Sequence, residues 1–220
     1  MPDDKRLDGI LFDMDGTLFA TEEIWYQSEV KLMNSFGVEW NRADHAICVG
    51  GPISRVTQYM IEKIPTPISQ KELFDLEMHY IEREFAESKI TWQPGAEELV
   101  IDAKKQSVPI ALVTASSQHL VNLVSAQMDL TIFDTIVCGD DVETPKPSPD
   151  AYVLALGNLD LRSDRVVAIE DSNSGVRSAL SANLHVLCPP SHVITIEHKR
   201  IKFVSSLDGI SVKDLEFWNW

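Results

Sequence analysis

The feature that most constrains this chain is a regular alternation, from residue 92 onward, of short apolar runs with amphipathic stretches. The apolar runs are rich in aliphatic and β-branched residues, which is typical of buried strands; they cover residues 108–113, 135–138, 165–169 and 184–187. The stretches between these runs favour helices. Strands that alternate with helices pair in parallel, so the pattern predicts an α/β fold, a parallel sheet with helices on both faces.

A fifth apolar run lies much earlier, at residues 9–12, and also predicts a buried strand. Residues 19–91, which follow it, contain no convincing strand pattern. Their apolar spacing and stop signals predict helices at about residues 21–36, 53–64 and 69–85. We therefore expect a core made of residues 1–18 and 92–220, with residues 19–91 inserted as a small all-helical domain.

Charge and composition exclude several classes of function. The formal net charge is −15, which disfavours binding to nucleic acids and to anionic membranes. The densest basic cluster, residues 198–202, is expected to be a solvated helix end or loop. The sequence has no apolar run of membrane-spanning length and no signal-peptide pattern, so we expect a cytoplasmic protein. Three cysteines without metal-like spacing are expected to be buried thiols: Cys48, Cys138 and Cys188.

Polar residues follow four of the apolar runs directly, at the point where each predicted strand ends. They form the segments Asp13–Leu18, Thr114–Ser116, Gly139–Asp150 and Glu170–Gly175. Because ligands gather at the carboxyl ends of parallel strands, these segments should build one site. Carboxylates brought together repel one another, and a hard cation such as Mg²⁺ would hold them ionised. A hydroxyl, a lysine and free amides complement a phosphate group.

These segments carry four ordered motifs: D-x-D-G-T-L from Asp13, a threonine after an apolar strand at Thr114, K-P-x-P from Lys146, and E-D-S-x-x-G from Glu170. In this order they resemble the haloacid dehalogenase-like hydrolase superfamily. The similarity is greatest to the branch that contains sugar phosphatases, phosphoglycolate phosphatase and beta-phosphoglucomutase. It covers nearly the whole chain and implies a Rossmann-like core with an inserted helical cap.

The resemblance implies a role for each motif residue. Asp13 would be the nucleophile that forms a phospho-aspartyl intermediate, and Asp15 the general acid and then the general base. The metal, Mg²⁺, would be bound by Asp13, the backbone carbonyl of Asp15, Glu170 and Asp171. The phosphate would be held by Gly16, Thr17, Thr114, Ala115 and Lys146, with Thr114 and Lys146 also acting in catalysis.

Structural alternatives remain open for some of these residues. Thr114 and its competitor Ser116 are both candidates to cap the following helix, and Lys146 is alternatively a solvated loop residue. Ser172 and Asn173 favour a helix-cap role. The acidic residues near Lys146 are interpreted as loop structure rather than metal ligands: Asp140, Asp141 and Glu143. Among the histidines only His119 lies close enough to the motifs to be considered.

Four residues of the insert are substrate-binding candidates: Glu22, Trp25, Gly51 and Arg55. Gly51 belongs to a glycine turn that opens the second predicted helix, and it resembles a turn of phosphoglycolate phosphatase-like proteins. Core packing is the alternative for Trp25, and a solvated helix position is the alternative for Arg55. The chain departs from the family at Ala20, where many relatives carry an acidic residue, so no relative's substrate can be transferred directly.

The resulting hypothesis is a Mg²⁺-dependent phosphatase that acts on a small phosphorylated metabolite, a sugar phosphate above all, and that works as a monomer. An alternative is a phosphosugar mutase that uses the same aspartate. That reading is weakened because Trp25 stands where beta-phosphoglucomutase has a histidine. A minor alternative is a non-enzymatic phospho-acceptor or binding protein.

Overall fold

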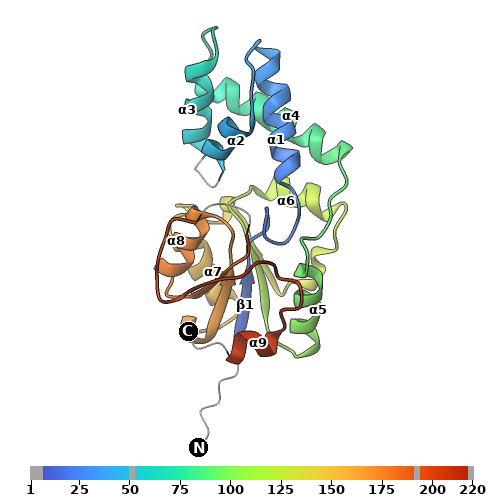
Figure 1. The fold of residues 1–220 in the computed structure, drawn as a ribbon, viewed down its shortest axis with the longest axis vertical. Coiled ribbons are helices and arrows are strands. Elements are labelled where there is room, and N and C mark those ends of the chain that lie inside the picture. The colour runs from blue at the N-terminus through green and yellow to red at the C-terminus, as the bar shows by residue number, and fades with distance from the viewer. Residues whose placement is uncertain (1–6, 50–52, 191–193, 218–220) are drawn as a thin grey trace, which may run out of the picture. The chain divides into compact units, whose positions relative to one another are not determined.

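A computed structural model describes residues 7–49, 53–190 and 194–217. These residues divide into two compact units (Figure 1). The core unit consists of residues 1–20 and 91–220, and the helical unit consists of residues 21–90.

Within the described part of the core unit, six strands form one sheet in which every neighbouring pair is parallel. The strands are β1 (Gly9–Phe12), β2 (Ile110–Val113), β3 (Thr135–Val137), β4 (Val166–Ile169), β5 (His185–Cys188) and β6 (Ile201–Phe203). Their spatial order is β3-β2-β1-β4-β5-β6. The predicted Rossmann-like α/β class is therefore confirmed.

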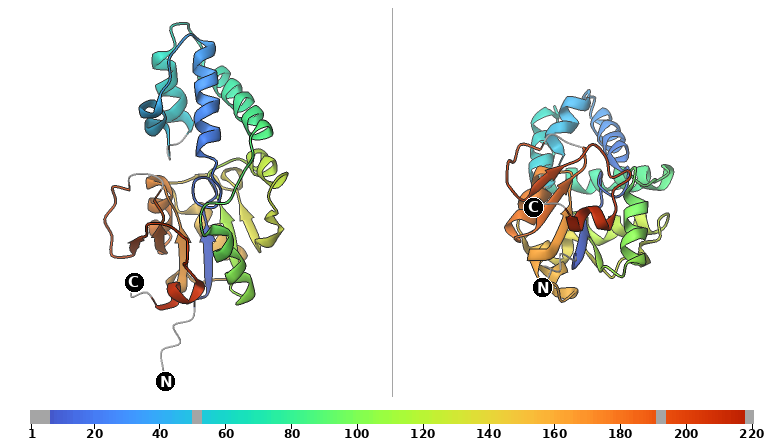
Figure 2. Two further views of the ribbon diagram at one scale, coloured as in Figure 1. Left: turned by 45° about the vertical axis from the view of Figure 1, so that its right-hand side comes forward. Right: turned by 60° about the horizontal axis from the view of Figure 1, so that its bottom comes forward.

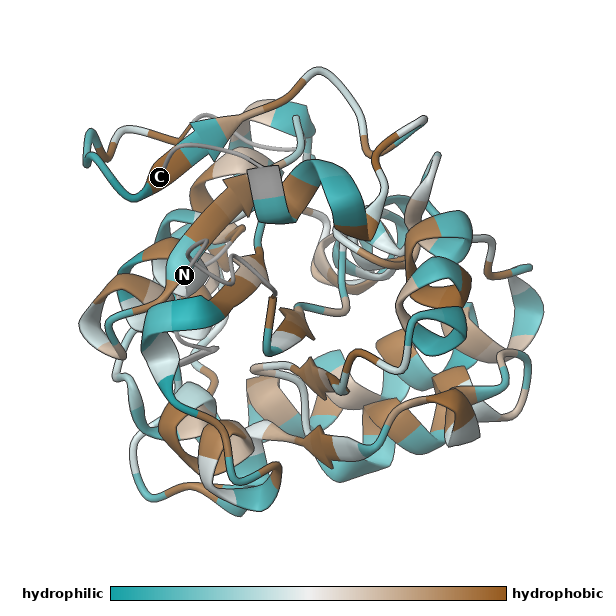
Figure 3. Ribbon diagram, turned by 90° about the horizontal axis from the view of Figure 1, so that it is seen from below, coloured by the Kyte–Doolittle hydropathy of each residue, from teal (hydrophilic) through white to brown (hydrophobic). Residues whose placement is uncertain are grey.

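The sheet is buried on both sides because helices flank it (Figure 2). The helices of this unit are α5 (Ala96–Lys105), α6 (Gln118–Ser125), α7 (Asp150–Asn158), α8 (Asn173–Ser181) and α9 (Val212–Phe217). Every residue of β1, β2 and β4 is buried, and the strands are coloured mainly as hydrophobic in Figure 3. On one face, α7 and α8 pack their apolar residues onto alternate strand positions such as Leu11 and Ala168. Strands covered on both faces are expected to be continuous apolar runs, which explains why they were recognisable in the sequence.

Short 3₁₀ turns complete the core unit at Leu130–Ile132, Gly139–Asp141 and Ser163–Arg165. The three cysteines are free and buried, as expected. No helix in the described segments is long and apolar enough to cross a membrane.

The helical unit contains α1 (Glu22–Ser35), α2 (Arg42–Cys48), α3 (Ile53–Lys63) and α4 (Gln70–Glu87). Gly37 follows α1 with a φ of 73°, the left-handed conformation that commonly ends a helix. Ser69 begins α4 with a capping box to Glu72. A cluster of buried residues from all four helices, including Leu32, Met60 and Leu73, forms the interior of this unit.

Two elements differ from the sequence expectations. The basic cluster at residues 198–202 was expected to be a helix end or loop, but its last two residues form the start of β6. This strand pairs with β5, with Ile201 opposite Val186. Lys202 is tolerated there because β6 is an edge strand on which Lys202 and Phe203 keep partial access to solvent. Helix α2 was not predicted, since it is short and depends on a capping box between Asn41 and Asp44.

Candidate active site

The motif residues meet at the carboxyl ends of the central strands. Asp13 follows β1, Thr114 follows β2, and Glu170 with Asp171 follows β4; Lys146 lies on the loop that leads from β3 to α7. Strand order reverses direction between β1 and β4, which makes this the topological switch point where doubly wound sheets bind their ligands. All five of these side chains are buried.

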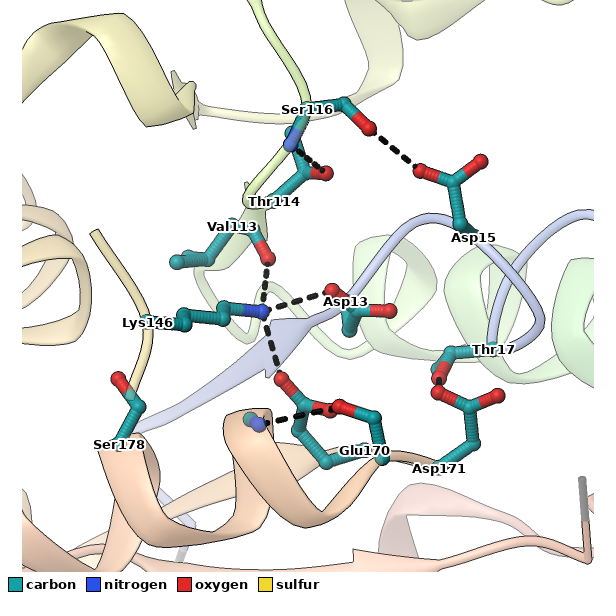
Figure 4. A network of polar contacts seen from close by, with 12 residues as sticks. Asp13, Asp15, Thr17, Val113, Thr114, Ser116, Lys146, Glu170, Asp171 and Ser178 are labelled. Atoms are coloured by element: carbon teal, nitrogen blue, oxygen red, sulfur yellow. Dashed lines mark hydrogen bonds and ion pairs between the residues drawn. The ribbon is translucent and has the colours of Figure 1, made fainter. Parts of the chain in front are cut away.

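Lys146 is the centre of a polar network (Figure 4). Its Nζ donates to Asp13 Oδ1 at 2.7 Å, to Glu170 Oε1 at 2.6 Å and to the carbonyl oxygen of Val113 at 2.8 Å. Burial alone disfavours a charged lysine, but the Asp13 and Glu170 carboxylates outweigh it and raise the pKa of Lys146. Lys146 is therefore a fixed buried cation and not a solvated loop residue.

Three carboxylates surround this cation. Asp13, Glu170 and Asp171 each offer an oxygen, and these oxygens lie within 4.8 Å of one another. Burial and, after it, the charge of Glu170 raise the pKa of Asp13 well above its ordinary value, although Lys146 acts in the opposite direction. One lysine thus does not balance three carboxylates. A cluster of buried hard oxygen donors with excess negative charge suits a divalent cation such as Mg²⁺.

Glu170 occupies a tightly defined place. The hydroxyl of Tyr152, on α7, donates to Glu170 Oε1 at 2.7 Å, in addition to the bond from Lys146. A Cβ atom on Gly175 would lie only 1.8 Å from the same oxygen, so the glycine leaves the space that the carboxylate fills. Sequence reasoning missed Tyr152. One signal was available in the sequence: the helix after the lysine motif carries a tyrosine on its apolar face. A tyrosine hydroxyl that is buried needs a hydrogen-bond partner, so a polar group had to lie nearby.

Asp15 is half-buried and lies in the turn after β1. Ser116 Oγ donates to Asp15 Oδ2 at 2.8 Å, and the Ser116 amide donates to Thr114 Oγ1 at 3.0 Å (Figure 4). Neither Thr114 nor Ser116 caps α6, contrary to the alternative raised for them: Ser117 is the N-cap residue. Ser116 instead connects the β2 segment to the proposed general acid.

The remaining phosphate-binding candidates differ in their surroundings. Thr17 Oγ1 donates to Asp171 Oδ1 at 3.2 Å, so it supports the acidic cluster. The Gly16 amide donates to the Phe19 carbonyl at 2.9 Å and closes the turn, while the Gly16 carbonyl accepts from Gln93. Ala115 is exposed.

Loop and helix-cap roles account for most of the other polar residues. Asp140 Oδ2 accepts from the Gln118 amide and Asp141 Oδ2 from the Cys138 amide, both at 2.8 Å. Ser172 Oγ accepts from the Gly175 amide at 3.0 Å and caps α8. Asn173 Oδ1 accepts from the backbone amide of Thr195 at 2.9 Å. Two further residues of this set are exposed: Glu143 and His119.

Three of the four substrate-binding candidates lie among the described residues of the helical unit. Glu22 and Trp25 are half-buried on α1, and the Trp25 ring stands edge-on to Phe85 with the ring centres 6.3 Å apart. Arg55 is exposed and donates to the Ile47 carbonyl at 2.9 Å. Gly51 lies outside the described residues.

Sequence reasoning also missed a buried polar group inside this unit. Glu29 is 4% exposed, and its Oε2 lies 2.9 Å from Trp40 Nε1 and 2.8 Å from His45 Nδ1. Glu77 is 2% exposed, and its Oε2 has no hydrogen-bond partner among the described residues.

This chain is similar to known proteins in sequence and in fold. Protein CbbY of Cereibacter sphaeroides is 31% identical over 194 residues, covering 84% of each chain. A phosphorylated carbohydrates phosphatase of Thermotoga maritima is 29% identical over 179 residues, covering 81% of this chain and 82% of its own. The crystal structure of CbbY from Rhodobacter sphaeroides in complex with xylulose-(1,5)bisphosphate superposes with a TM-score of 0.81 at 28% identity, over 95% of this chain and 99% of the other.

The family that matches is the haloacid dehalogenase-like hydrolases, over residues 10–188. The matched segment runs from β1 to β5, so it contains all four motifs and the helical unit. The expectation of a hydrolase rather than a non-enzymatic phospho-acceptor is supported by this match. The chain belongs to the haloacid dehalogenase-like hydrolase family.

Proposed function

We propose that this protein is a Mg²⁺-dependent phosphatase that hydrolyses a phosphorylated sugar through a phospho-aspartyl intermediate on Asp13. The observation that carries the proposal is the buried cluster of Asp13, Glu170 and Asp171 around Lys146. Support for the substrate class comes from two relatives, one named a phosphatase of phosphorylated carbohydrates and one solved with a sugar bisphosphate.

The metal would be held by Asp13, Glu170, Asp171 and the backbone carbonyl of Asp15. When bound, Mg²⁺ would supply positive charge that neutralises the phosphoryl oxygens and the carboxylate cluster. Carboxylates bind the cation in their ionised form, so the bound cation would hold Asp13 ionised against the burial that raises its pKa.

In the first step Asp13 attacks phosphorus. Lys146 holds Oδ1, so Oδ2 is the oxygen that forms the new bond. As this bond forms, the bond from phosphorus to the leaving oxygen breaks, and Asp15 gives its proton to that oxygen. Lys146 remains beside the reacting carboxylate and offsets the charge that develops on the phosphoryl group.

In the second step water replaces Asp13 on phosphorus. Asp15, now ionised, takes a proton from the water, the new oxygen–phosphorus bond forms, and the bond to Asp13 breaks. Ser116 donates a hydrogen bond to Asp15 Oδ2 and so restricts the orientation of the proton-carrying group in both steps.

The test is a panel of phosphorylated sugars and a generic phosphate ester, assayed with Mg²⁺ and with a chelator. We expect Mg²⁺-dependent release of inorganic phosphate from at least one sugar phosphate. Absence of phosphate release from the whole panel would contradict the proposal. Conversion of glucose 1-phosphate to glucose 6-phosphate faster than phosphate release would instead show the mutase.

A further inference from the structure

A tyrosine that no motif includes is built into the lysine–carboxylate network. Tyr152 is completely buried on α7, and its hydroxyl lies 2.7 Å from Glu170 Oε1. The same oxygen accepts from Lys146 Nζ at 2.6 Å. Lys146 Nζ also lies 5.0 Å from the centre of the Tyr152 ring, within the range of a cation–π contact. Tyr152 therefore contacts both the acid and the cation.

These contacts restrict a side chain that would otherwise have several rotamers. Glutamate has three side-chain torsions, and a metal ligand must keep its carboxylate in one place for the site to be preorganised. Lys146 Nζ supplies Glu170 Oε1 with one of its three donor hydrogens, because the other two go to Asp13 Oδ1 and the Val113 carbonyl. A second donor that belongs to a rigid, buried ring fixes Oε1 independently of the lysine.

The backbone of α8 also approaches the Glu170 carboxylate. Gly175 approaches so closely that a Cβ atom there would lie within 2.0 Å of the carboxylate atoms. The carboxylate thus has both the hydroxyl of Tyr152 and the backbone of α8 close to it. Because a hydrogen bond to a charged carboxylate is stronger than one between neutral groups, losing it should change how the carboxylate is held.

We propose that Tyr152 is a positioning residue that fixes Glu170, and through it Lys146, for metal binding and phosphoryl transfer. The inference rests on the proposed function for its catalytic consequence, but its consequence for metal binding can be measured separately. Tyr152 itself does not touch the reacting atoms. Its hydroxyl acts only through the Glu170 carboxylate, and its ring acts only through packing against the lysine.

The variant Tyr152→Phe isolates the hydroxyl, since it keeps the ring, its packing and its contact with Lys146. A matched control is Tyr59→Phe in the helical unit. The Tyr59 hydroxyl donates to the Asp44 carboxylate at 2.8 Å, nearly the same bond as that of Tyr152. Both variants lose one hydroxyl–carboxylate hydrogen bond, and only Tyr152→Phe loses it at the acidic cluster.

The experiment is a titration of the full-length proteins with Mn²⁺, which has the same ligand preferences as Mg²⁺ and is followed by electron paramagnetic resonance. We expect Tyr152→Phe to weaken Mn²⁺ binding about 10-fold and to lower the turnover of a sugar phosphate at saturating Mg²⁺ by a similar factor. Tyr59→Phe should match the wild type in both. Thermal unfolding of both variants separates a general loss of stability from an effect on the site.

The outcomes are distinguishable. If Tyr152→Phe binds Mn²⁺ with wild-type affinity, or if the wild type binds no Mn²⁺, the positioning role is overturned. If Tyr152→Phe unfolds earlier but keeps its metal affinity, the hydroxyl is only structural and the role is again overturned. If the wild type binds Mn²⁺ but releases no phosphate from any substrate, the proposed function fails, and the comparison of Mn²⁺ affinities still decides the role of Tyr152.

Discussion

Both units of this protein bury carboxylates, but they do so in different ways. In the core unit, Asp13, Glu170 and Asp171 crowd together around a single buried lysine. In the helical unit, one oxygen of Glu29 contacts the side-chain nitrogens of Trp40 and His45, and Glu77 is buried with no hydrogen-bond partner for Oε2 among the described residues. Among the described residues, only the core cluster brings three possible ligand oxygens together.

The comparison shows that buried charge alone does not identify a reactive site. A buried carboxyl group held by ring nitrogens, or protonated because of its surroundings, stabilises one arrangement of helices. Carboxylates that repel one another and share one cation lower the stability of the folded protein unless a ligand relieves the repulsion.

The largest effect is expected for Asp13→Asn. An amide is a poor nucleophile, so phosphate release should fall at least about 1,000-fold, measured as kcat with saturating sugar phosphate and Mg²⁺. The control is Glu98→Gln, the same chemical change at an exposed position on α5, which should keep wild-type activity. An active Asp13→Asn protein would remove the core cluster from the mechanism.

Gly175→Ala should lower catalytic activity more than it lowers the stability of the fold. The new methyl group would meet the Glu170 carboxylate at 1.8–2.0 Å, and Lys146 and Tyr152 hold that carboxylate in place. We expect kcat to fall about 100-fold, which corresponds to about 2.7 kcal/mol.

Gly157→Ala is the matched control, because a Cβ atom at this helical glycine has open space around it. It should leave kcat unchanged and stabilise the protein by about 0.5–1 kcal/mol, measured by denaturant unfolding. Unchanged kcat in Gly175→Ala would show that Glu170 needs no defined place, and an equal loss in both variants would show that the effect is not specific to Glu170.

Glu77→Gln probes the buried carboxylate of the helical unit. Burial, and after it the charge of Glu29, raise the pKa of Glu77 from an ordinary value of 4.5 to about 8. The folded state thus binds the proton more tightly, and its stability relative to the unfolded state falls as pH rises from about 4.5 through 8. The neutral glutamine avoids this loss.

The free energy of unfolding should therefore be about 2–4 kcal/mol higher for Glu77→Gln than for the wild type at pH 9, and nearly equal at pH 5. Urea unfolding at the two pH values measures it. The exposed Glu62→Gln is the control and should show no such pH dependence. A constant difference at both pH values would mean that Glu77 is ionised in the folded protein.

The smallest effect is expected for Ser116→Ala. Its hydroxyl orients Asp15 through one hydrogen bond of 2.8 Å, so its loss should lower kcat about 3- to 10-fold without unfolding the protein. The neighbouring Ser117→Ala should do the reverse: it removes the N-cap of α6, costs about 1 kcal/mol of stability and leaves kcat nearly unchanged. If the two variants behaved alike, Ser116 would have no role beyond the local turn.

The sequence predicted the core better than the details of the site because the end of a buried strand can be recognised from a local pattern along the chain. Asp13, Thr114 and Glu170 each follow a continuous apolar run, and parallel pairing then places them at one edge of the sheet. Tyr152 was not predictable in this way, since its function depends on which face of α7 it occupies and on a carboxylate from a different strand.

Short elements and exact cap positions were also beyond sequence reasoning. Strand β6 has three residues, and it can be recognised as a strand only from its pairing with β5. Thr114, Ser116 and Ser117 all have helix-capping side chains within one short segment, and backbone conformation decides which of them is the N-cap. Glu29 and His45 lie on separate helices, so no local sequence pattern predicts that they contact each other.

The central claim is that Asp13 becomes an acyl phosphate during turnover. The direct measurement is to quench the reacting enzyme with acid, reduce the acyl phosphate with borohydride and map the modified peptide by mass spectrometry. The account predicts that Asp13 is converted to homoserine only when both substrate and Mg²⁺ are present. Phosphate release under the same conditions, with Asp13 unmodified or with another residue reduced in its place, would contradict it.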